Sequence, residues 1–424
     1  MSQQRLDPSK TRSDITETIK ELSQRILFQP RAIQSIKMAV THSHSPFRRQ
    51  NRPIHCVLFI GPSGVGKTAL VRELSDIMFQ DPHGVVTIDG SEFGSEFTAS
   101  RILGSPPGYV GYEEPTPLRQ ERVDRPALAR VRKILAHIDP GRHKEIEELD
   151  EKISEMRQEL RLLKQGPNAS TIKDDIKKIR GLIQQLQNKQ GLILQMTIRE
   201  HGGFFSLVLF DEIEKAHPKI WNLLLQILDE GRLNLSDGNT TSFNNSIIVL
   251  TSNVESRKMA QFASGVPEIG FSDEHKIGDK AYEQARQLVS KTFPPELLGR
   301  VDNIVLFRPF GERELRTIVQ QKIDLLLKEI AYSRCPFELE VDEQIYDFIV
   351  KEALERPEEG ARRVKKKVFS HLGEPIETLI VSGQIQPAET IRASIENDVI
   401  IFTKDTEQKG VQDKETFNKI SQQI

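Results

Sequence analysis

The chain of 424 residues is poor in cysteine, with only Cys56 and Cys335. Two cysteines are too few for a disulfide framework and are typical of a reducing compartment. Cys56 lies in an apolar run, so we expect it to be a small core residue. Long apolar stretches are also missing, since none approaches the roughly 20 residues of a membrane-spanning helix. Residues 1–20 lack the apolar region of a secretory signal. These absences predict a cytoplasmic protein with no membrane partner.

An excess of either charge is absent as well. Lysine and arginine total 59, aspartate and glutamate total 61, and the formal net charge is −2. Because a dedicated duplex-DNA-binding protein usually carries a basic excess, this balance argues against a nucleic-acid partner. The charged fraction of 28% indicates a globular protein with long solvated helices. The length allows two or three domains.

One glycine-rich segment carries a specific chemical signal. Residues 61–68 match the phosphate-binding pattern G-x-x-x-x-G-K-[ST], between an apolar run at 54–60 and a helical pattern at 69–79. Glycines let backbone N–H groups close around the phosphates of ATP, and the following helix directs its positive end at them. Lys67 can reach the β- and γ-phosphates, and the Thr68 hydroxyl can ligate Mg²⁺. The expected nucleotide-binding residues are Gly61, Pro62, Ser63, Gly64, Val65, Gly66, Lys67, Thr68 and Ala69.

Polar residues at two strand ends complete a candidate hydrolytic site. Asp211 and Glu212 end an apolar strand pattern. A phosphate-loop ATPase needs one carboxylate to hold Mg²⁺ and a second group to polarise the attacking water, and we assign these roles to Asp211 and Glu212. Asn253 follows the apolar run at 247–250 and can contact the γ-phosphate or the water, although asparagine there is also a common turn residue. Arg300 is a candidate cation supplied to a neighbouring subunit; taken alone, it is typical of a surface residue.

The alternation of strand-like and helical patterns predicts the fold class. Strand-like runs recur at 54–60, 85–88, 207–210, 247–250 and 304–307, with helical patterns between them. This is typical of an α/β fold with a parallel sheet flanked by helices. From residue 312 the pattern predicts a smaller, mostly helical C-terminal domain with a last strand at 390–402. The expected organisation is a polar lead at 1–20, a large ATPase domain at 21–310 with an inserted helical region at 118–195, the small domain at 311–403 and a polar tail at 404–424.

One segment interrupts the alternation. Apolar residues at 146, 149, 153, 156, 160 and 163 alternate spacings of three and four, which is a heptad seam. After a Gly166-Pro167-Asn168 turn signal, the seam resumes at Ile172, Ile176, Ile179, Ile183 and Leu186. We therefore predict an antiparallel coiled-coil hairpin at 142–190, with a first arm about 30 Å long at 1.5 Å per residue. The alternative is a pair of ordinary helices lying on the core.

Several long strings resemble the AAA+ ATPases of the Clp family, above all the second ATPase ring of the ClpB, ClpA and ClpC unfoldases. They stand in the family's order across roughly residues 20–400. The strings are Arg52-Pro53-Ile54, residues 104–114 (GSPPGYVGYEE), residues 211–218 (DEIEKAHP), residues 223–233 (LLLQILDEGRL) and Gly360-Ala361-Arg362. The resemblance implies an AAA+ large domain followed by a helical lid domain.

The resemblance implies a role for each matching position. Asn253 matches the sensor-1 residue, Arg300 the arginine finger that acts across the subunit interface, and Arg362 the sensor-2 arginine of the small domain. With Lys67, Asp211 and Glu212 they form the catalytic set. The string Gly108-Tyr109-Val110-Gly111 matches the central pore loop, where an aromatic side chain grips an extended polypeptide. Residues 229–243 match a second pore-facing loop. Without the resemblance, Tyr109 is typical of an ordinary aromatic residue in a Gly/Pro loop.

The implied function is mechanical. Subunits of such proteins form a ring, expected here to be a hexamer, and bind ATP and Mg²⁺ between neighbours. Hydrolysis pulls unfolded or aggregated polypeptides through the pore. The expected activity is therefore that of an ATP-dependent protein unfoldase or disaggregase with chaperone function.

The sequence departs from the family pattern in several places. Phe28-Gln29 stands where the family has Gly-Gln, and Arg363-Val364-Lys365 replaces the usual Pro-Leu-Lys after Arg362. A single phosphate loop indicates a single-ring form. The hairpin falls between the pore loop and Asp211, unlike the coiled-coil domain of ClpB, so we hypothesise that it is a docking or regulatory arm.

Three alternatives stay open. The tripeptide Ile269-Gly270-Phe271 resembles the motif with which Clp unfoldases dock on ClpP-type peptidases, which would make the chain a regulatory protease subunit, although apolar loop residues often pack locally. A DNA-remodelling ATPase also places a coiled coil between its nucleotide motifs, but its signature string is absent. A scaffold that hydrolyses ATP poorly is disfavoured because Lys67, Asp211 and Glu212 are all present.

Overall fold

The computed structural model describes residues 11–47, 51–104, 116–165, 173–201, 203–253 and 287–404. The chain folds into two compact units. The first comprises Met1–Gly61 and Gly66–Arg308, and the second comprises Pro62–Val65 and Pro309–Ile424. By its contacts, the tip of the glycine-rich loop therefore belongs with the second unit.

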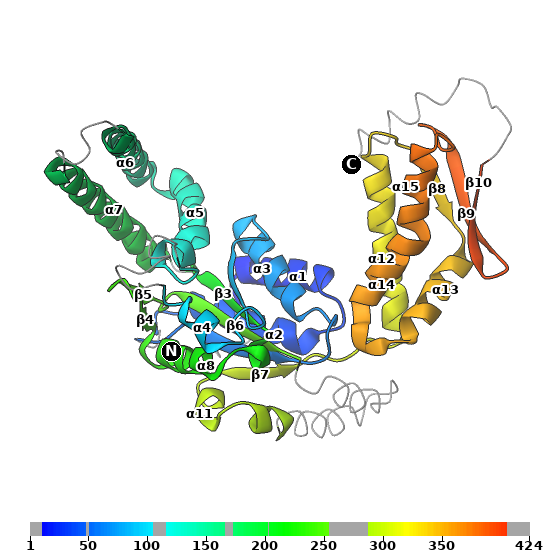
Figure 1. Ribbon diagram of the computed structural model, residues 1–424, viewed down its shortest axis with the longest axis horizontal. Coiled ribbons are helices and arrows are strands. Elements are labelled where there is room, and N and C mark those ends of the chain that lie inside the picture. The colour runs from blue at the N-terminus through cyan, green and yellow to red at the C-terminus, as the bar shows by residue number, and fades with distance from the viewer. Residues whose placement is uncertain are drawn as a thin grey trace, which may run out of the picture. The chain divides into compact units, whose positions relative to one another are not determined.

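A five-stranded parallel sheet forms the centre of the first unit, in the order β2-β3-β6-β1-β7 (Figure 1). The strands are β1 (His55–Ile60), β2 (Val85–Asp89), β3 (Ser206–Asp211), β6 (Ser246–Ser252) and β7 (Asn303–Leu306). The five predicted strands are thus confirmed. Because β3 and β6 are parallel neighbours, the polar residues at their carboxyl ends meet at one edge of the sheet.

Helices bury both faces of this sheet, and every side chain of β1 is buried. Alternate β1 residues, among them Leu58 and Ile60, join an apolar cluster with α8 (Pro218–Glu230). Helices α2 (Pro30–Ser43) and α3 (Lys67–Phe79) also pack on the central strands. The first unit further contains α1 (Ser13–Arg25), α4 (Glu96–Ser100), the short turn η1 (Ile213–Lys215), the ribbon of β4 (Arg232–Asn234) and β5 (Thr240–Ser242), and α11 (Pro295–Leu298).

The N-terminal helix begins earlier than the sequence pattern indicated. We expected a polar lead at 1–20, but α1 starts at Ser13. Ile15 and Leu22 are both buried in its apolar stripe, so residues 13–20 are part of the packed structure. Ile15, Ile19 and Leu22 have the helical spacing of four and three, but the polar residues that make up most of 1–20 obscured this stripe.

The inserted helical hairpin is confirmed. It is formed by α6 (Pro140–Gln165) and α7 (Lys173–His201), which run side by side away from the sheet in Figure 1. Its outer part is held by Ile153, Ile179 and Ile183, all of them predicted seam residues. The base has its own apolar cluster with α5 (Gln120–Ile138), to which Ile146 and Leu149 of the seam contribute.

Polar contacts join the base of the hairpin to α5. The guanidinium of Arg132 on α5 pairs with Asp150 on α6 at 3.0 Å, and Gln190 on α7 donates to the same carboxylate at 2.8 Å. Since α5 also packs against β2 and β3, the hairpin is anchored to the sheet through this helix.

The second unit is helical with a small sheet. Its elements are α12 (Glu312–Ala331), β8 (Glu338–Val341), α13 (Glu343–Leu354), η2 (Pro357–Glu359), α14 (Gly360–Val368), the π-helical turn η3 (Phe369–Gly373), α15 (Glu374–Val381), β9 (Thr390–Glu396) and β10 (Val399–Lys404). The sheet order is β10-β9-β8. The single last strand expected at 390–402 is wrong. Asn397 and Asp398, both with positive φ, turn the chain into an antiparallel hairpin instead.

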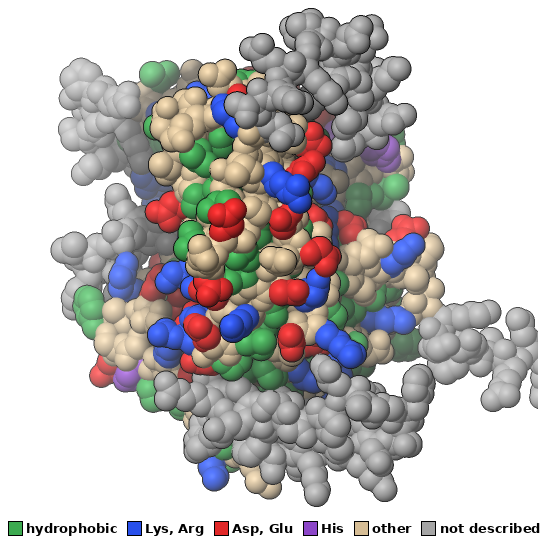
Figure 2. Space-filling view, turned by 90° about the vertical axis from the view of Figure 1, so that its right-hand side faces the viewer, with side chains coloured by type: hydrophobic (Ala, Val, Ile, Leu, Met, Phe, Trp, Pro, Cys, Tyr) green, Lys and Arg blue, Asp and Glu red, His purple; other side chains and the backbone are tan. Residues whose placement is uncertain are grey.

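Charged side chains of both signs are mixed over the face that Figure 2 presents. On the second unit they pair locally, for example Arg392 with Asp342 at 3.1 Å and Lys404 with Glu389 at 3.0 Å. Such exposed pairs stabilise the fold little. Among the side chains coloured in Figure 2, neither charge forms a large area of its own. In the ranges described, no helix combines the length and the apolar character needed to cross a bilayer.

Candidate nucleotide-binding and hydrolysis site

The glycine-rich loop connects β1 to α3, as its sequence predicts. Gly61, Gly64 and Gly66 all have positive φ, and Gly66 is the residue before the first turn of α3. A Cβ on Gly61 would lie 2.7 Å from the carbonyl oxygen of Phe307, so only glycine fits there. The loop therefore turns directly from the sheet edge into the positive end of a helix, which suits an anionic ligand.

Lys67 is buried in the first turn of α3. Its Nζ donates to the carbonyl of Gly61 at 2.8 Å and to Oδ1 of Asn253 at 2.7 Å. The amide of Asn253 in turn donates from Nδ2 to Oε1 of Glu212 at 2.9 Å. Three residues from three separate parts of the sequence thus form one hydrogen-bonded path.

Asp211 lies next to the loop at the end of β3. The hydroxyl of Thr68 donates to its two carboxylate oxygens at 3.0 and 3.1 Å. Thr251 at the end of β6 also donates to Asp211. Hydroxyl and carboxylate oxygens are the hard ligands that Mg²⁺ prefers, so Thr68 and Asp211 fit the metal expected from the sequence.

Glu212 has an unusual backbone conformation for a residue with a side chain, with φ 52° and ψ 46°. A left-handed residue costs about 1–2 kcal/mol and is typical of functional sites. Its N–H donates to Oγ1 of Thr251 at 3.0 Å, and its Oε2 pairs with Lys215 one turn later. The hydrogen bond from Lys215 to Glu212 raises the pKa of Lys215. The carboxylate is therefore held from two sides, by Asn253 and by Lys215.

Gly90 supports the two acids from the neighbouring strand. It follows β2, and its N–H donates to the carbonyl of Asp211 at 2.7 Å. A Cβ on Gly90 would lie 2.4 Å from the carbonyl oxygen of Glu212. The backbone of the acid pair therefore needs a glycine at this position.

Arg300 follows α11, on the first unit. Its Nε donates to both oxygens of Asp229 at 2.7 and 2.9 Å, and its Nη1 donates to the carbonyl of Glu296 at 3.2 Å. Asp229 also accepts a bond from Arg52 at 3.3 Å. The hydrogen bond from Arg300 lowers the pKa of Asp229, and the same contact raises the pKa of Arg300.

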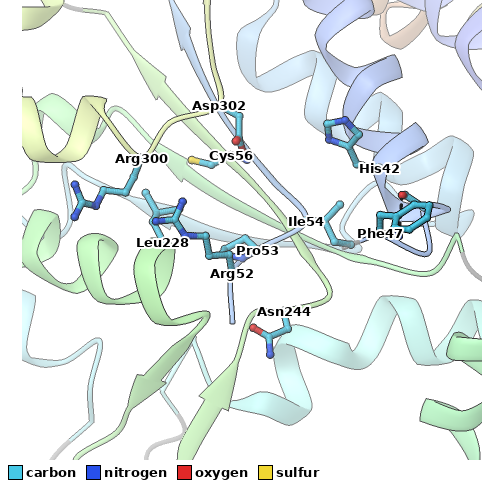
Figure 3. A pocket seen from close by; sticks show the side chains of 11 residues that line it. His42, Phe47, Arg52, Pro53, Ile54, Cys56, Leu228, Asn244, Arg300 and Asp302 are labelled. Carbon is cyan, nitrogen blue, oxygen red and sulfur yellow. Dashed lines mark hydrogen bonds between the residues drawn. The ribbon is translucent and has the colours of Figure 1, made fainter. Parts of the chain in front are cut away.

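A pocket of about 220 Å³ lies beside Arg300 (Figure 3). Figure 3 shows Arg52 and Arg300 among the residues that line it, with Leu228 between them and with Cys56 and Asp302 above them in the view. Cys56 is buried, as predicted, and burial raises the pKa of its thiol.

The second unit contains Arg362 and the tip of the loop. Within this unit, the N–H of Ala361 donates to the carbonyl of Gly64 at 3.0 Å, and Ser63 donates to the carbonyl of Glu358 at 3.0 Å. Arg362 is exposed at the start of α14. Arg363, which replaces the proline of the family pattern, is buried and donates to the carbonyl of Glu352 at 2.7 Å. The departure thus anchors the helix and leaves Arg362 accessible.

The Phe28-Gln29 departure has a clear backbone consequence. Phe28 has φ 62°, the left-handed conformation that favours the glycine of the family pattern. Gln29 is buried and exchanges two hydrogen bonds with the backbone of Arg308, at 3.0 and 3.2 Å. The conformation is therefore kept, although the residue is different.

Sequence reasoning missed Thr251, Lys215, Asp229 and Gly90 as members of the site. Thr251 stands two residues before Asn253 in the same polar strand end, which was a usable signal. The others act through contacts that no spacing reveals. The predicted pore loop at 108–111 and the tripeptide at 269–271 lie outside the described residues, and most of the second pore-loop segment forms the end of α8 and the β4–β5 ribbon.

Two family models match the chain. The AAA domain (Cdc48 subfamily) matches residues 52–128 and 147–304, and the C-terminal, D2-small domain, of ClpB protein matches residues 310–393. The interruption between 128 and 147 falls in α5 and the base of the hairpin.

Known chaperones are similar over almost the whole chain. It is 30% identical over 391 residues to the probable chaperone protein ClpB 1 of Chlorobaculum tepidum, covering 91% of this chain and 68% of that protein. It is 28% identical to chaperone protein ClpB of Bdellovibrio bacteriovorus and 27% identical to that of Lactiplantibacillus plantarum, covering 34% and 36% of those proteins. It thus spans about a third of the last two. The chain belongs to the AAA domain (Cdc48 subfamily) family, and within it to the ClpB-like proteins, where it resembles the second AAA module.

Proposed function

We propose that the chain is an ATP-driven chaperone that unfolds or disaggregates proteins by threading them through a ring of its own subunits. The observation that carries this proposal is the path from Lys67 through Asn253 to Glu212, with Thr68 and Asp211 beside it. It supplies a phosphate-contacting cation, a metal-ligand pair and an acid next to one another. These are the groups that phosphoryl transfer to water requires.

The roles of the residues follow from their chemistry. Lys67 and the loop N–H groups bind the phosphates of ATP, while Thr68 and Asp211 hold Mg²⁺, which supplies charge neutralisation to the phosphates when bound. Glu212 orients the attacking water and accepts its proton, because Asn253 and Lys215 hold its carboxylate in place. Arg362 of the small domain contacts the γ-phosphate.

Arg300 acts on the nucleotide of the neighbouring subunit in this proposal. Arginine is the usual group for stabilising transition-state charge in trans, and such a residue contributes about 10³–10⁵ to the rate of phosphoryl transfer. The site is then complete only in an oligomer, which we propose to be a hexameric ring. Hydrolysis moves the Tyr109 loop along a threaded polypeptide, so that unfolded or aggregated chains of many sequences are substrates.

The hairpin α6–α7 is a docking or regulatory arm in this account. Its base is packed on α5, and α5 packs on α3, the helix that carries Lys67 and Thr68. Replacing residues 153–183 by a short glycine-serine turn removes the outer cluster and keeps the base. We expect this variant to keep basal ATPase activity and to lose activity on aggregated or folded substrates. Unchanged activity on those substrates would show that the outer part of the hairpin has no docking or regulatory role.

A ClpP-type peptidase is the second candidate partner, proposed from Ile269-Gly270-Phe271 alone. A pull-down with ClpP that compares the wild type with Phe271→Ala tests it. Equal capture of both proteins would count against docking through this tripeptide.

Steady-state ATPase assays test the main proposal. We expect hydrolysis by the wild type that unfolded casein stimulates and duplex DNA does not. Glu212→Gln should lose at least about 100-fold in kcat and still bind ATP, because the glutamine cannot accept the proton. Stimulation by DNA but not by casein would favour a DNA-remodelling ATPase, and no hydrolysis by the wild type would favour a scaffold.

A further inference from the structure

Asp229 holds Arg300 in an orientation suited to a phosphate. The carboxylate accepts hydrogen bonds only from Nε of the guanidinium, at 2.7 and 2.9 Å, and the carbonyl of Glu296 accepts from Nη1 at 3.2 Å. Among the residues that the structure describes, none accepts a hydrogen bond from Nη2 of Arg300. Since a guanidinium is a rigid planar fork, fixing two of its three nitrogens also fixes the direction of the third.

Arg52 holds the carboxylate in turn. Its Nη2 donates to Oδ1 of Asp229 at 3.3 Å, from the segment that leads into β1. Asp229 stands in the last turn of α8. The relay of hydrogen bonds from Arg52 to Asp229 and from Arg300 to Asp229 therefore joins three parts of the sequence. Figure 3 shows Arg52 and Arg300 on the wall of the same pocket, on either side of Leu228. Arg52 thus helps to orient Asp229, a role that its place in the sequence did not reveal.

We propose that Asp229 is the positioning residue for Arg300, and that Arg52 orients Asp229. Asp229 binds only Nε and so leaves Nη2 to donate to a phosphate oxygen on the neighbouring subunit. The inference deepens the proposed function, since it rests on the role of Arg300 in trans. A long side chain that is already ordered loses less conformational entropy when it binds, so the contact favours the transition state.

Asp229→Asn tests the proposal, because it keeps the size of the side chain and removes its charge. We expect kcat for ATP to fall about tenfold or more, with KM within about twofold and ring assembly by sedimentation unchanged. The matched control is Asp76→Asn, which breaks a similar half-exposed pair with Arg25 at 2.6 Å and should leave kcat unchanged.

The decisive readout is a double-mutant cycle. In the Arg300→Ala background, Asp229→Asn should change kcat by less than about twofold, because no arginine is left to position. Equal losses in both backgrounds would assign Asp229 a general structural role and overturn the inference. So would an unchanged kcat for Asp229→Asn while Arg300→Ala is impaired.

A second variant covers the case in which Asp229→Asn does not fold. Arg52→Gln should lower kcat less than Asp229→Asn, and its effect should also vanish in the Arg300→Ala background. If Arg52→Gln still lowers kcat in the Arg300→Ala background, Arg52 does not act through Arg300, and the inference is overturned. If Arg300→Ala itself keeps the wild-type kcat, the proposed role of Arg300 in trans fails, and the inference fails with it.

Discussion

The side-chain amide of Asn253 donates a hydrogen bond to Oε1 of Glu212 at 2.9 Å. The contact joins the ends of two neighbouring parallel strands, and the other end of the same amide accepts from Lys67. The position of the candidate acid therefore depends on the residue that we expect to contact the γ-phosphate. This arrangement can couple the presence of ATP to the orientation of Glu212.

Replacing Asn253 by alanine should misplace Glu212 without removing it. We expect kcat for ATP hydrolysis to fall about 10- to 100-fold, since a positioned acid contributes about that much or more. ATP binding should change little, because Lys67 and the loop remain. Kinetics with a fluorescent-nucleotide titration separate the two effects, and an unchanged kcat would show that the amide does not set the orientation of Glu212.

Gly90→Ala should impair hydrolysis through the backbone of the acid pair. The added Cβ would lie 2.4 Å from the carbonyl oxygen of Glu212, so that segment must shift. A displacement of this kind costs about tenfold to 100-fold in kcat. Gly94→Ala is the control, since its Cβ would come no closer than 3.4 Å to any neighbour. Equal ATPase rates for both variants would contradict the proposed fit.

Gly360→Ala should disturb the packing of the loop tip within the second unit. Gly360 has φ 52°, and a Cβ would lie 2.8 Å from the carbonyl oxygen of Gly64. We expect weaker ATP binding, measured by titration. Gly383→Ala is a strain-matched control, because Gly383 has φ 75° and open space around it. The control should lose about 1 kcal/mol of stability and keep ATP affinity. Equal ATP affinity in both variants would exclude a role for the Gly64 contact.

Asp124 should make the first unit less stable as the pH rises. Burial raises its pKa to about 6 from an ordinary value of 3.8, although Gln120 donates to it at 2.7 Å. A pKa raised in the folded state stabilises the fold below the unfolded pKa, and this contribution is lost as the pH rises through about 6.

Asp124→Asn removes the charge and keeps an acceptor for Gln120. Relative to the wild type, it should gain about 1–3 kcal/mol of stability at pH 8 and almost nothing at pH 4. Denaturation curves of both proteins at the two pH values measure this difference. A gain that is the same at pH 4 and pH 8 would show that ionisation is not its cause.

The strands, the loop and the hairpin seam could be predicted because each depends on a local pattern. The β1 run is apolar apart from His55, the loop has its lysine and threonine at set positions, and Ile153 and Ile183 occupy heptad positions. The polar contacts of the site could not be predicted in this way. Asp229 and Arg300 are 71 positions apart in the sequence, and only the packing of α8 against α11 brings them together.

Local turns limited the prediction elsewhere. The strand expected at 390–402 is divided by Asn397 and Asp398, which form a two-residue hairpin turn. Asparagine and aspartate tolerate the left-handed conformation of such a turn, so this was a usable local signal. The left-handed conformation of Glu212 has no such local signal, because tertiary contacts impose it.

The most direct test of the account is subunit mixing. Arg300→Ala and Glu212→Gln should each be almost inactive as homogeneous rings. In an equimolar mixture, Arg300 of one variant faces the intact Glu212 of the other at roughly a quarter of the interfaces, if subunits exchange at random. We predict that the mixture regains up to about that fraction of wild-type ATPase activity. A mixture no more active than the separate variants, with subunit exchange verified by energy transfer between labelled subunits, would contradict hydrolysis at a shared site.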